Sequence, residues 1–250
     1  GLYYRYDGVD VQQTRHYIKL SAESYIERVL LSHGWDKPTS RESDTYEKSA
    51  LQPESATPLQ TLVGPSEGTV EHGVLEKAMG FSYRQLMGEL MYAYVTCRLD
   101  IGFAVTFLSK FSGSPHEKHY QALKGVCKYL RRNISWGLIY HRGDRPIMSL
   151  PVGGFQFVEE DPSLPPFPAT DLDVLTAYVD AAHATDMKTR RSVTGSGIVL
   201  ANAAVSYKTK LQPVVATSST EAEFVAAVTA AKDVKHLRSI LCGLGYPSLE

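Results

Sequence analysis

Two stretches decide the fold of this chain: AYVDA at residues 177–181 and SSTEAEFVA at residues 218–226. The first predicts a strand that ends in a carboxylate, and the second opens a helix expected to run from 219 to 244. Two more strands are predicted between them, at 192–200 and 204–208. Three strands in a meander followed by a helix predict an α/β layer in which the helix covers one face of the sheet.

One face of the helix at 219–244 carries a stripe of mostly apolar residues. Its members recur in steps of four and three, as on one face of an α-helix: Glu223, Ala227, Ala230, Val234, Leu237, Leu241 and Leu244. Glu223 is therefore expected to face the sheet, whereas Glu221 lies about 200° away. Because a buried carboxylate is costly unless it is paired or bound to a cation, Glu223 and Asp180 are predicted to converge on one divalent ion.

Carboxylates on a strand and a helix suit Mg²⁺, which prefers oxygen ligands and is usually held by a few acids together with water and substrate phosphate. Two such ions about 4 Å apart can stabilise the attacking and leaving oxygens of a hydrolysis. The residues alone leave a structural alternative open. Glu in the first turn of a helix interacts favourably with the helix dipole, and Asp at a strand end is often a turn former.

Residues 81–150 predict a helical region. Three helices are expected there, at 82–94, at 99–111 and from Pro115 onward. The last one carries an apolar stripe of Tyr120, Leu123, Cys127 and Leu130. A neighbouring basic stripe consists of Lys124, Lys128 and Arg131. The region holds ten basic and four acidic residues, a balance that suits contact with phosphate groups. A solvated helical surface is the alternative.

Other side chains also leave two interpretations open. His116 and His119 either share a metal ion or form a capped helix start. The tyrosines of the helical region either stack on bases or pack in the core. Lys188, Arg190 and Arg191, between the first two strands of the C-terminal region, either contact a nucleic-acid backbone or form a solvated turn.

Changes in composition divide the rest of the chain. A strand at 15–20 is followed by a helix that Ser21 is expected to cap and that runs to Gly34. The next segment is rich in Ser, Thr, Glu and Pro, which predicts a long loop. Prolines and acids at 151–173 break both helix and sheet, which predicts a linker. The predicted parts are residues 1–35, 36–80, 81–150, 151–173 and 174–250.

The composition is that of an ordinary globular chain, with 43% hydrophobic and 21% charged residues. No apolar run approaches the ~20 residues of a membrane span, and the N-terminus has neither the features of a signal peptide nor an initiator Met. Cys97, Cys127 and Cys242 are scattered, which favours a reducing compartment over a disulfide framework. We expect an intracellular piece of a longer chain, neither secreted nor in a membrane.

Seven short motifs follow one another along the chain: ATPL (56–59), YRQLMGELMY (83–92), RLDIGFAV (98–105), HYQALK (119–124), KYL (128–130), SYKTKLQP (206–213) and SSTEAEF (218–224). In this order the chain resembles, over nearly its whole length, the reverse transcriptase–ribonuclease H region of copia-type LTR retrotransposon polyproteins. The resemblance implies an α+β fold. It assigns the end of a polymerase palm to 1–35, a helical thumb or connection to 81–150 and an incomplete ribonuclease H-like domain to 174–250. That domain would be a three-stranded antiparallel meander plus a long helix.

The resemblance also implies functional residues. The metal-binding Asp of the family's first ribonuclease H strand matches Asp180, and the acid of its first helix matches Glu223. The implied cofactor is Mg²⁺, with Mn²⁺ as an alternative. The implied partners are an RNA–DNA hybrid or template–primer and the remainder of the polyprotein, in a cytoplasmic particle or the nucleus. The candidate nucleic-acid-binding residues are Lys124, Lys128, Arg131, Arg190 and Arg191.

The sequence departs from the family in several places. The polymerase signature Tyr-x-Asp-Asp and the later ribonuclease H acids do not occur in it, and His183 and Leu99 replace a usual Trp and Pro. Asp186 matches a family acid to which we assign no catalysis, and Asp233 lies too far along its helix to substitute. We therefore expect a polyprotein fragment with little or no activity alone. The alternative is a non-catalytic nucleic-acid-binding or structural remnant.

Overall fold

The computed structural model describes residues 4–14, 16–37, 49–142 and 174–246. The chain divides into two compact units. The helical unit comprises Arg5–Asp10 and Leu20–Gly137, and the sheet unit comprises Gly1–Tyr4, Val11–Lys19 and Leu138–Glu250. Helices occur together with two antiparallel sheets, which agrees with the expected α+β class. The linker predicted at 151–173 lies outside the described residues.

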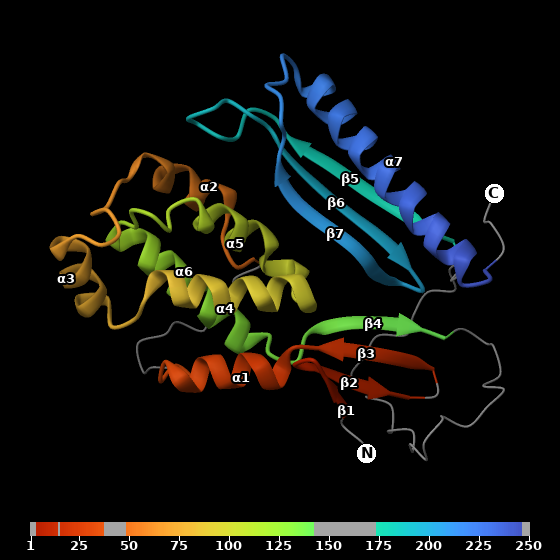
Figure 1. Ribbon diagram of the computed structural model, residues 1–250, viewed down its shortest axis with the longest axis horizontal. Helices are drawn as coiled ribbons and strands as arrows, with labels where there is room; N and C mark the ends of the chain where they lie inside the picture. The colour runs from red at the N-terminus through yellow and green to blue at the C-terminus, as the bar shows by residue number, and fades with distance from the viewer. Residues whose placement is uncertain (1–3, 15, 38–48, 143–173, 247–250) are drawn as a thin grey trace. The chain divides into compact units, whose positions relative to one another are not determined.

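Helices make up most of the helical unit (Figure 1). In chain order they are α1 (Glu23–Ser32), α2 (Pro53–Ala56), the 3₁₀ helix η1 (Thr57–Thr61), α3 (Val70–Met79), α4 (Tyr83–Thr96), the 3₁₀ helix η2 (Leu99–Ile101), α5 (Gly102–Ser109) and α6 (Glu117–Arg132). The helices predicted over 81–150 are confirmed as α4, α5 and α6. The buried side chains of α6 include its predicted apolar stripe, Tyr120, Leu123, Cys127 and Leu130. Tyr83, Tyr94 and Tyr129 are buried as well, so these tyrosines pack in the core.

The loop expected over residues 36–80 is wrong for its described part, because α2, η1 and α3 lie there. These helices are short and carry no sustained apolar period in the sequence, and the local signals lie at the ends of α2 and α3. Pro53 occupies the first turn of α2. The Thr69 hydroxyl accepts a hydrogen bond from the His72 N–H at 3.2 Å, and Gly80, at φ +82°, ends α3 in the left-handed conformation.

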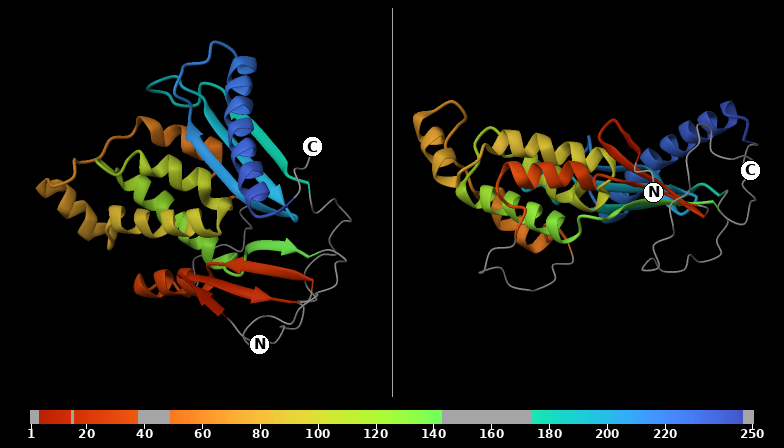
Figure 2. Two further views of the ribbon diagram at one scale, coloured as in Figure 1. Left: turned by 45° about the vertical axis from the view of Figure 1, so that its right-hand side comes forward. Right: turned by 90° about the horizontal axis from the view of Figure 1, so that it is seen from below.

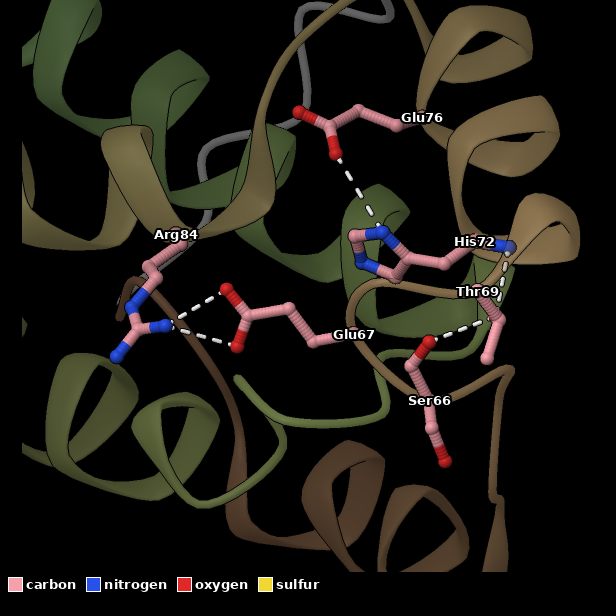
Figure 3. A network of polar contacts seen from close by, with 6 residues as sticks. All are labelled: Ser66, Glu67, Thr69, His72, Glu76 and Arg84. Carbon is pink, nitrogen blue, oxygen red and sulfur yellow. Dashed lines mark hydrogen bonds and ion pairs between the residues drawn. The ribbon is translucent and has the colours of Figure 1, made fainter.

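A polar network connects the start of α3 to α4 (Figure 3). Its members are Ser66, Glu67, Thr69, His72, Glu76 and Arg84. Arg84 donates to both carboxylate oxygens of Glu67, at 2.6 and 2.8 Å. The Thr69 hydroxyl donates to the Ser66 carbonyl at 2.7 Å. Because Arg84 and Glu67 are exposed, their ion pair orients this segment and adds little stability.

Two buried charged groups hold other helix ends. Arg98, fully buried, donates from Nε and Nη2 to Asp100 at 2.9 and 2.7 Å, and from Nη1 to the carbonyl of Asn133, the C-cap of α6, at 2.9 Å. Asp10 accepts a hydrogen bond from the Ser24 N–H at 2.7 Å, so it caps α1 from a distant part of the chain. The cap predicted at Ser21 is therefore wrong.

The strands form two sheets. The first contains β1 (Tyr4–Tyr6), β2 (Val9–Gln13), β3 (Tyr17–Ser21) and β4 (Gly137–His141), in the order β1-β2-β3-β4. The second is the predicted meander of β5 (Thr176–Ala182), β6 (Val193–Leu200) and β7 (Ala203–Leu211), followed by α7 (Ser219–Gly243). Among the described residues, no helix has both the length and the apolar character of a membrane span.

The helix α7 lies along one face of the β5-β6-β7 sheet (Figures 1 and 2). Small side chains form the interface near its N-terminus: Ala181, Ala216, Ala222 and Ala226 are buried, with Val179 packed against them. Further along, Lys208 of β7 donates to both carboxylate oxygens of Asp233, each at 2.7 Å. The alanines allow close approach at one end of the helix, and the ion pair joins helix and sheet farther along it.

His119 fixes the start of α6. Its buried ring accepts a hydrogen bond at Nδ1 from the His116 N–H, at 3.0 Å, and its Nε2 lies 2.9 Å from the Leu59 carbonyl, to which only a protonated Nε2 can donate. The ring stacks on Phe111 with centroids 4.0 Å apart. Because His116 Nδ1 accepts from the Lys118 N–H, the pair forms a capping box. Of the two interpretations of these histidines, the capped helix start is confirmed.

We expect the stability of the helical unit to fall in mild acid because of His119. Burial lowers the pKa of this side chain, so the folded state favours the neutral ring while the unfolded chain takes up a proton below about pH 6.5. The stabilisation is complete above that pH and is lost as the pH falls toward the folded-state pKa. Denaturant unfolding between about pH 7 and about pH 5 measures this loss. His119→Gln, which keeps a donor and an acceptor without titrating, should flatten the profile; an unchanged profile would contradict the assignment.

Candidate functional site

Glu223 lies in the first turns of α7, and its carboxylate reaches β5. Its Oε1 accepts a hydrogen bond from the Ala181 N–H at 3.3 Å. In the described part of the chain, β5 pairs only with β6, so its other side is an open edge of the sheet. The Glu223 carboxylate therefore accepts a hydrogen bond from a backbone N–H that no neighbouring strand pairs. Glu223 is thereby held beside the residue that follows Asp180.

The predicted orientation of Glu223 needs a correction. Glu223 and Ala227 are exposed, and the helix buries Ala222 and Ala226 in their place, whereas Ala230 of the predicted stripe is buried as expected. Small side chains at these positions let α7 approach β5 closely, which directs Glu223 along the flank of the interface. Farther along, the predicted stripe holds better: Val234, Leu237 and Leu241 are partly buried, whereas Leu244 is exposed.

Asp180 is exposed on β5. It lies between Val179 and Ala181, which pack against α7, so strand alternation directs its side chain to the other face of the sheet. Its cross-strand partner is Gly195, where a Cβ would meet no described atom within 4 Å. The Asp180 side chain thus lies on the face of the sheet away from α7, next to open space. The Glu223 carboxylate lies on the α7 side, at the backbone N–H of the neighbouring residue Ala181. That the two carboxylates share an ion stays a prediction.

Glu221 has a different role from Glu223. Its Oε2 accepts hydrogen bonds from the Thr217 hydroxyl at 2.6 Å and the Thr217 N–H at 2.7 Å, and its own N–H donates to Ser218 Oγ at 3.1 Å. The hydrogen bonds from Thr217 lower the pKa of this carboxyl. Ser218 is therefore the N-cap of α7, and the Glu221 carboxylate holds the preceding residue, Thr217, which leaves Glu223 as the acid of the first turns that can bind a ligand.

Two of the predicted nucleic-acid-binding residues on α6 have structural contacts. Arg131 Nη1 donates to the carbonyls of Trp35 and Lys37, at 3.0 and 3.2 Å. The Lys124 ammonium lies over the Trp35 ring, 5.0 Å from its centroid. Both hold the segment after α1 against α6, while Lys128 is exposed. The sequence carries no signal for these contacts, because they join residues about ninety positions apart.

The other two candidates, Arg190 and Arg191, lie in the connection between β5 and β6. Asp186 organises this turn: its carboxylate accepts from the Thr189 N–H at 3.0 Å and the Thr189 hydroxyl at 2.6 Å. The Arg190 N–H donates to the Asp186 carbonyl at 2.7 Å. Arg190 is exposed, at φ +55°. The arginines therefore follow the end of the strand that carries Asp180.

The candidate site contains two acids. Within the residues that the structure describes, no group of three or more His, Cys, Asp and Glu side chains is arranged to hold a metal ion. Two other acids of the sheet unit already accept hydrogen bonds from side chains: Asp186 from Thr189, and Asp233 from Lys208. A cation bound between Asp180 and Glu223 would therefore take its remaining ligands from water or from a substrate.

The chain is similar in sequence to retrovirus-related Pol polyproteins of transposons. The chain is 32% identical over 241 residues to the polyprotein from transposon TNT 1-94 of Nicotiana tabacum, covering 96% of this chain and 15% of that protein. It is 29% identical over 191 residues to that from transposon RE1 of Arabidopsis thaliana, covering 76% and 11%. The chain belongs to the copia-type family of these polyproteins. It spans 15% or less of the length of these two relatives.

A shorter relative also matches. Over 151 residues the chain is 32% identical to secreted RxLR effector protein 161 of Plasmopara viticola, covering 60% of this chain and 87% of that protein. No family model matches the chain. No solved structure matches it either.

The two glutamates at the start of α7 are expected to respond differently to mutation. Glu221→Ala removes two short hydrogen bonds to Thr217, the residue before the N-cap Ser218, and should lower the midpoint of thermal unfolding at neutral pH, measured by helical circular dichroism. Glu223→Ala, two positions away, removes one long hydrogen bond and should lower it less. Because the folded-state pKa of Glu221 is lowered, its stabilisation is present above the unfolded-state pKa of about 4.3 and is lost in acid as the pH falls through the folded value. A larger loss for Glu223→Ala would contradict these roles.

Proposed function

We propose that this chain is part of a retroelement polyprotein that copies RNA into DNA and degrades the RNA strand of the hybrid. In this proposal the sheet unit is the first part of a ribonuclease H-like domain, and Asp180 and Glu223 are ligands of a catalytic Mg²⁺. The observation that supports it is the hydrogen bond from the Ala181 N–H to Glu223. This hydrogen bond holds the carboxylate of Glu223, on the helix, at the backbone of the residue that directly follows Asp180 on the strand.

Asp180 and Glu223 reach the edge of β5 from different sides of the sheet, so a metal would bind both carboxylates only at this edge. Both carboxylates are exposed, so they can bind a hard cation that keeps several of its waters. The open space above Gly195 leaves room beside Asp180. When bound, Mg²⁺ would polarise a phosphate oxygen and favour attack by water on the RNA phosphodiester. Mn²⁺ suits the same oxygen ligands.

The chain's own residues would supply binding and orientation. Asp180 and Glu223 would hold the ion from a strand and a helix that are packed together, which keeps their separation constant. Arg190 and Arg191, on the connection that leaves β5, would contact phosphates of the hybrid. With two acids at the site, we propose that this chain binds the metal weakly and cleaves the hybrid slowly or not at all.

Mn²⁺ titration of the 250-residue chain, followed by electron paramagnetic resonance, tests this proposal. Asp180→Asn and Glu223→Gln should each reduce the affinity about tenfold or more, because a carboxylate ligand is removed. Asp233→Asn, an acid of the same helix, should leave it unchanged. The unaltered chain should leave an RNA–DNA hybrid nearly intact in Mg²⁺. Equal Mn²⁺ binding by all variants would contradict the metal site; rapid cleavage lost in Asp180→Asn would contradict weak activity.

A second candidate function is non-catalytic nucleic-acid binding by the helical unit. The observation that favours it is the exposure of Lys128 and Arg132 on one face of α6. The matched segment makes up 87% of the RxLR effector relative, so a segment of this kind also occurs in a protein far shorter than the polyproteins.

Salt-dependent affinity for an RNA–DNA hybrid tests this second function. The pair Lys128→Glu and Arg132→Glu should weaken binding at low salt. It should also reduce the dependence of log affinity on log salt by about 1 for each phosphate that the variant no longer binds. Asp180→Asn should bind as the unaltered chain does. Absence of affinity at low salt would dismiss this function. This pair of substitutions leaves the contacts of Lys124 and Arg131 with Trp35 in place.

A further inference from the structure

Gln212 directly follows β7 and is 2% exposed. Its Nε2 donates two hydrogen bonds, to Thr194 Oγ1 of β6 and to the Ala222 carbonyl of α7, both at 2.9 Å. Its backbone N–H donates to the Ser192 carbonyl at 2.8 Å. One buried amide thus joins the sheet to the first turn of the helix.

These contacts form a ring that connects β5, β6 and α7 beside Glu223. Thr194 is the cross-strand partner of Ala181, and the Ala181 N–H donates to Glu223. Ala222, which accepts from Gln212, directly precedes Glu223. The ring therefore runs from strand to strand, through the amide to the helix and back to the strand edge. Any shift of α7 relative to β5 has to break one of these hydrogen bonds.

The chemistry of Gln212 indicates that its donors matter more than its bulk. Its Oε1 is buried and has no hydrogen-bond partner among the described residues. An unpaired buried acceptor costs free energy, and a methionine of similar size would avoid that cost. The Ala222 carbonyl can only accept, so the amide nitrogen must face it. Gln212 therefore stabilises the position of α7 at a cost that simple packing would not require.

We propose that Gln212 is a positioning residue for the metal site of Asp180 and Glu223. It fixes the first turns of α7 against β5 and β6, so that the Glu223 carboxylate stays at the Ala181 N–H. This inference rests on the proposed metal-binding function. Gln212 itself does not touch the ion; it acts through Ala222 and the helix.

The ion pair of Lys208 and Asp233 provides a matched control. It also joins α7 to the sheet, through two contacts of 2.7 Å. Asp233 lies ten residues beyond Glu223, about 15 Å along the helix. Lys208→Met thus removes a helix-to-sheet contact without touching the ring, whereas Gln212→Met removes both amide hydrogen bonds at nearly constant side-chain volume.

Two measurements on the 250-residue chain test the proposal. The first is hydrogen exchange of the Ala181 amide by NMR, which needs no metal. Gln212→Met should accelerate it about five- to tenfold, toward the rate in Glu223→Ala. The second is Mn²⁺ affinity, which should fall about tenfold or more in Gln212→Met. Lys208→Met should change neither quantity, even where it lowers the thermal midpoint.

The outcomes separate this proposal from the function on which it rests. Mn²⁺ binding by the unaltered chain, with unchanged affinity or unchanged Ala181 exchange in Gln212→Met, overturns the positioning role and leaves the metal site standing. Absence of Mn²⁺ binding by the unaltered chain overturns the metal site and the positioning role together. If Gln212→Met does not fold, Thr194→Val removes one bond of the same amide. It is judged by the same two measurements, with the same expected directions.

Discussion

The hydrogen bond between the Ala181 N–H and Glu223 is the interaction on which the candidate site depends. Edge strands leave backbone donors unpaired, and α7 supplies an acceptor to one of them. The alanines buried between α7 and β5 allow the approach that makes this contact possible. Because Ala181 directly follows Asp180 in β5, this hydrogen bond holds the Glu223 carboxylate next to the backbone of the strand acid.

The acids of the sheet unit around this contact divide into two groups. Asp186 holds a turn, Glu221 binds Thr217 before the start of α7, and Asp233 joins the helix to β7, each through short hydrogen bonds. Asp180 and Glu223 are exposed instead, and Glu223 makes one long hydrogen bond. Short, saturated contacts are typical of structural acids, whereas exposed and lightly bonded acids can accept a cation.

The sequence predicts those parts of the fold that repeat a pattern. The apolar stripe of α6 and the meander with α7 follow from periodicities that packing preserves. Single long-range contacts have no such pattern. Asp10 replaces Ser21 as the cap of α1 because a distant residue supplies the better acceptor. Trp35 engages two residues of the basic stripe for the same kind of reason.

The sequence also predicts the candidate site only in part. The spacing predicts that Asp180 and Glu223 belong to elements that pack together, and it misses that Ala222 rather than Glu223 faces the sheet. A crystal of this chain soaked in Mn²⁺ and measured at the manganese absorption edge tests the central claim most directly. We predict one anomalous peak within bonding distance of an oxygen from each of Asp180 and Glu223. A peak at only one of them, or none at the open edge of β5, would contradict it.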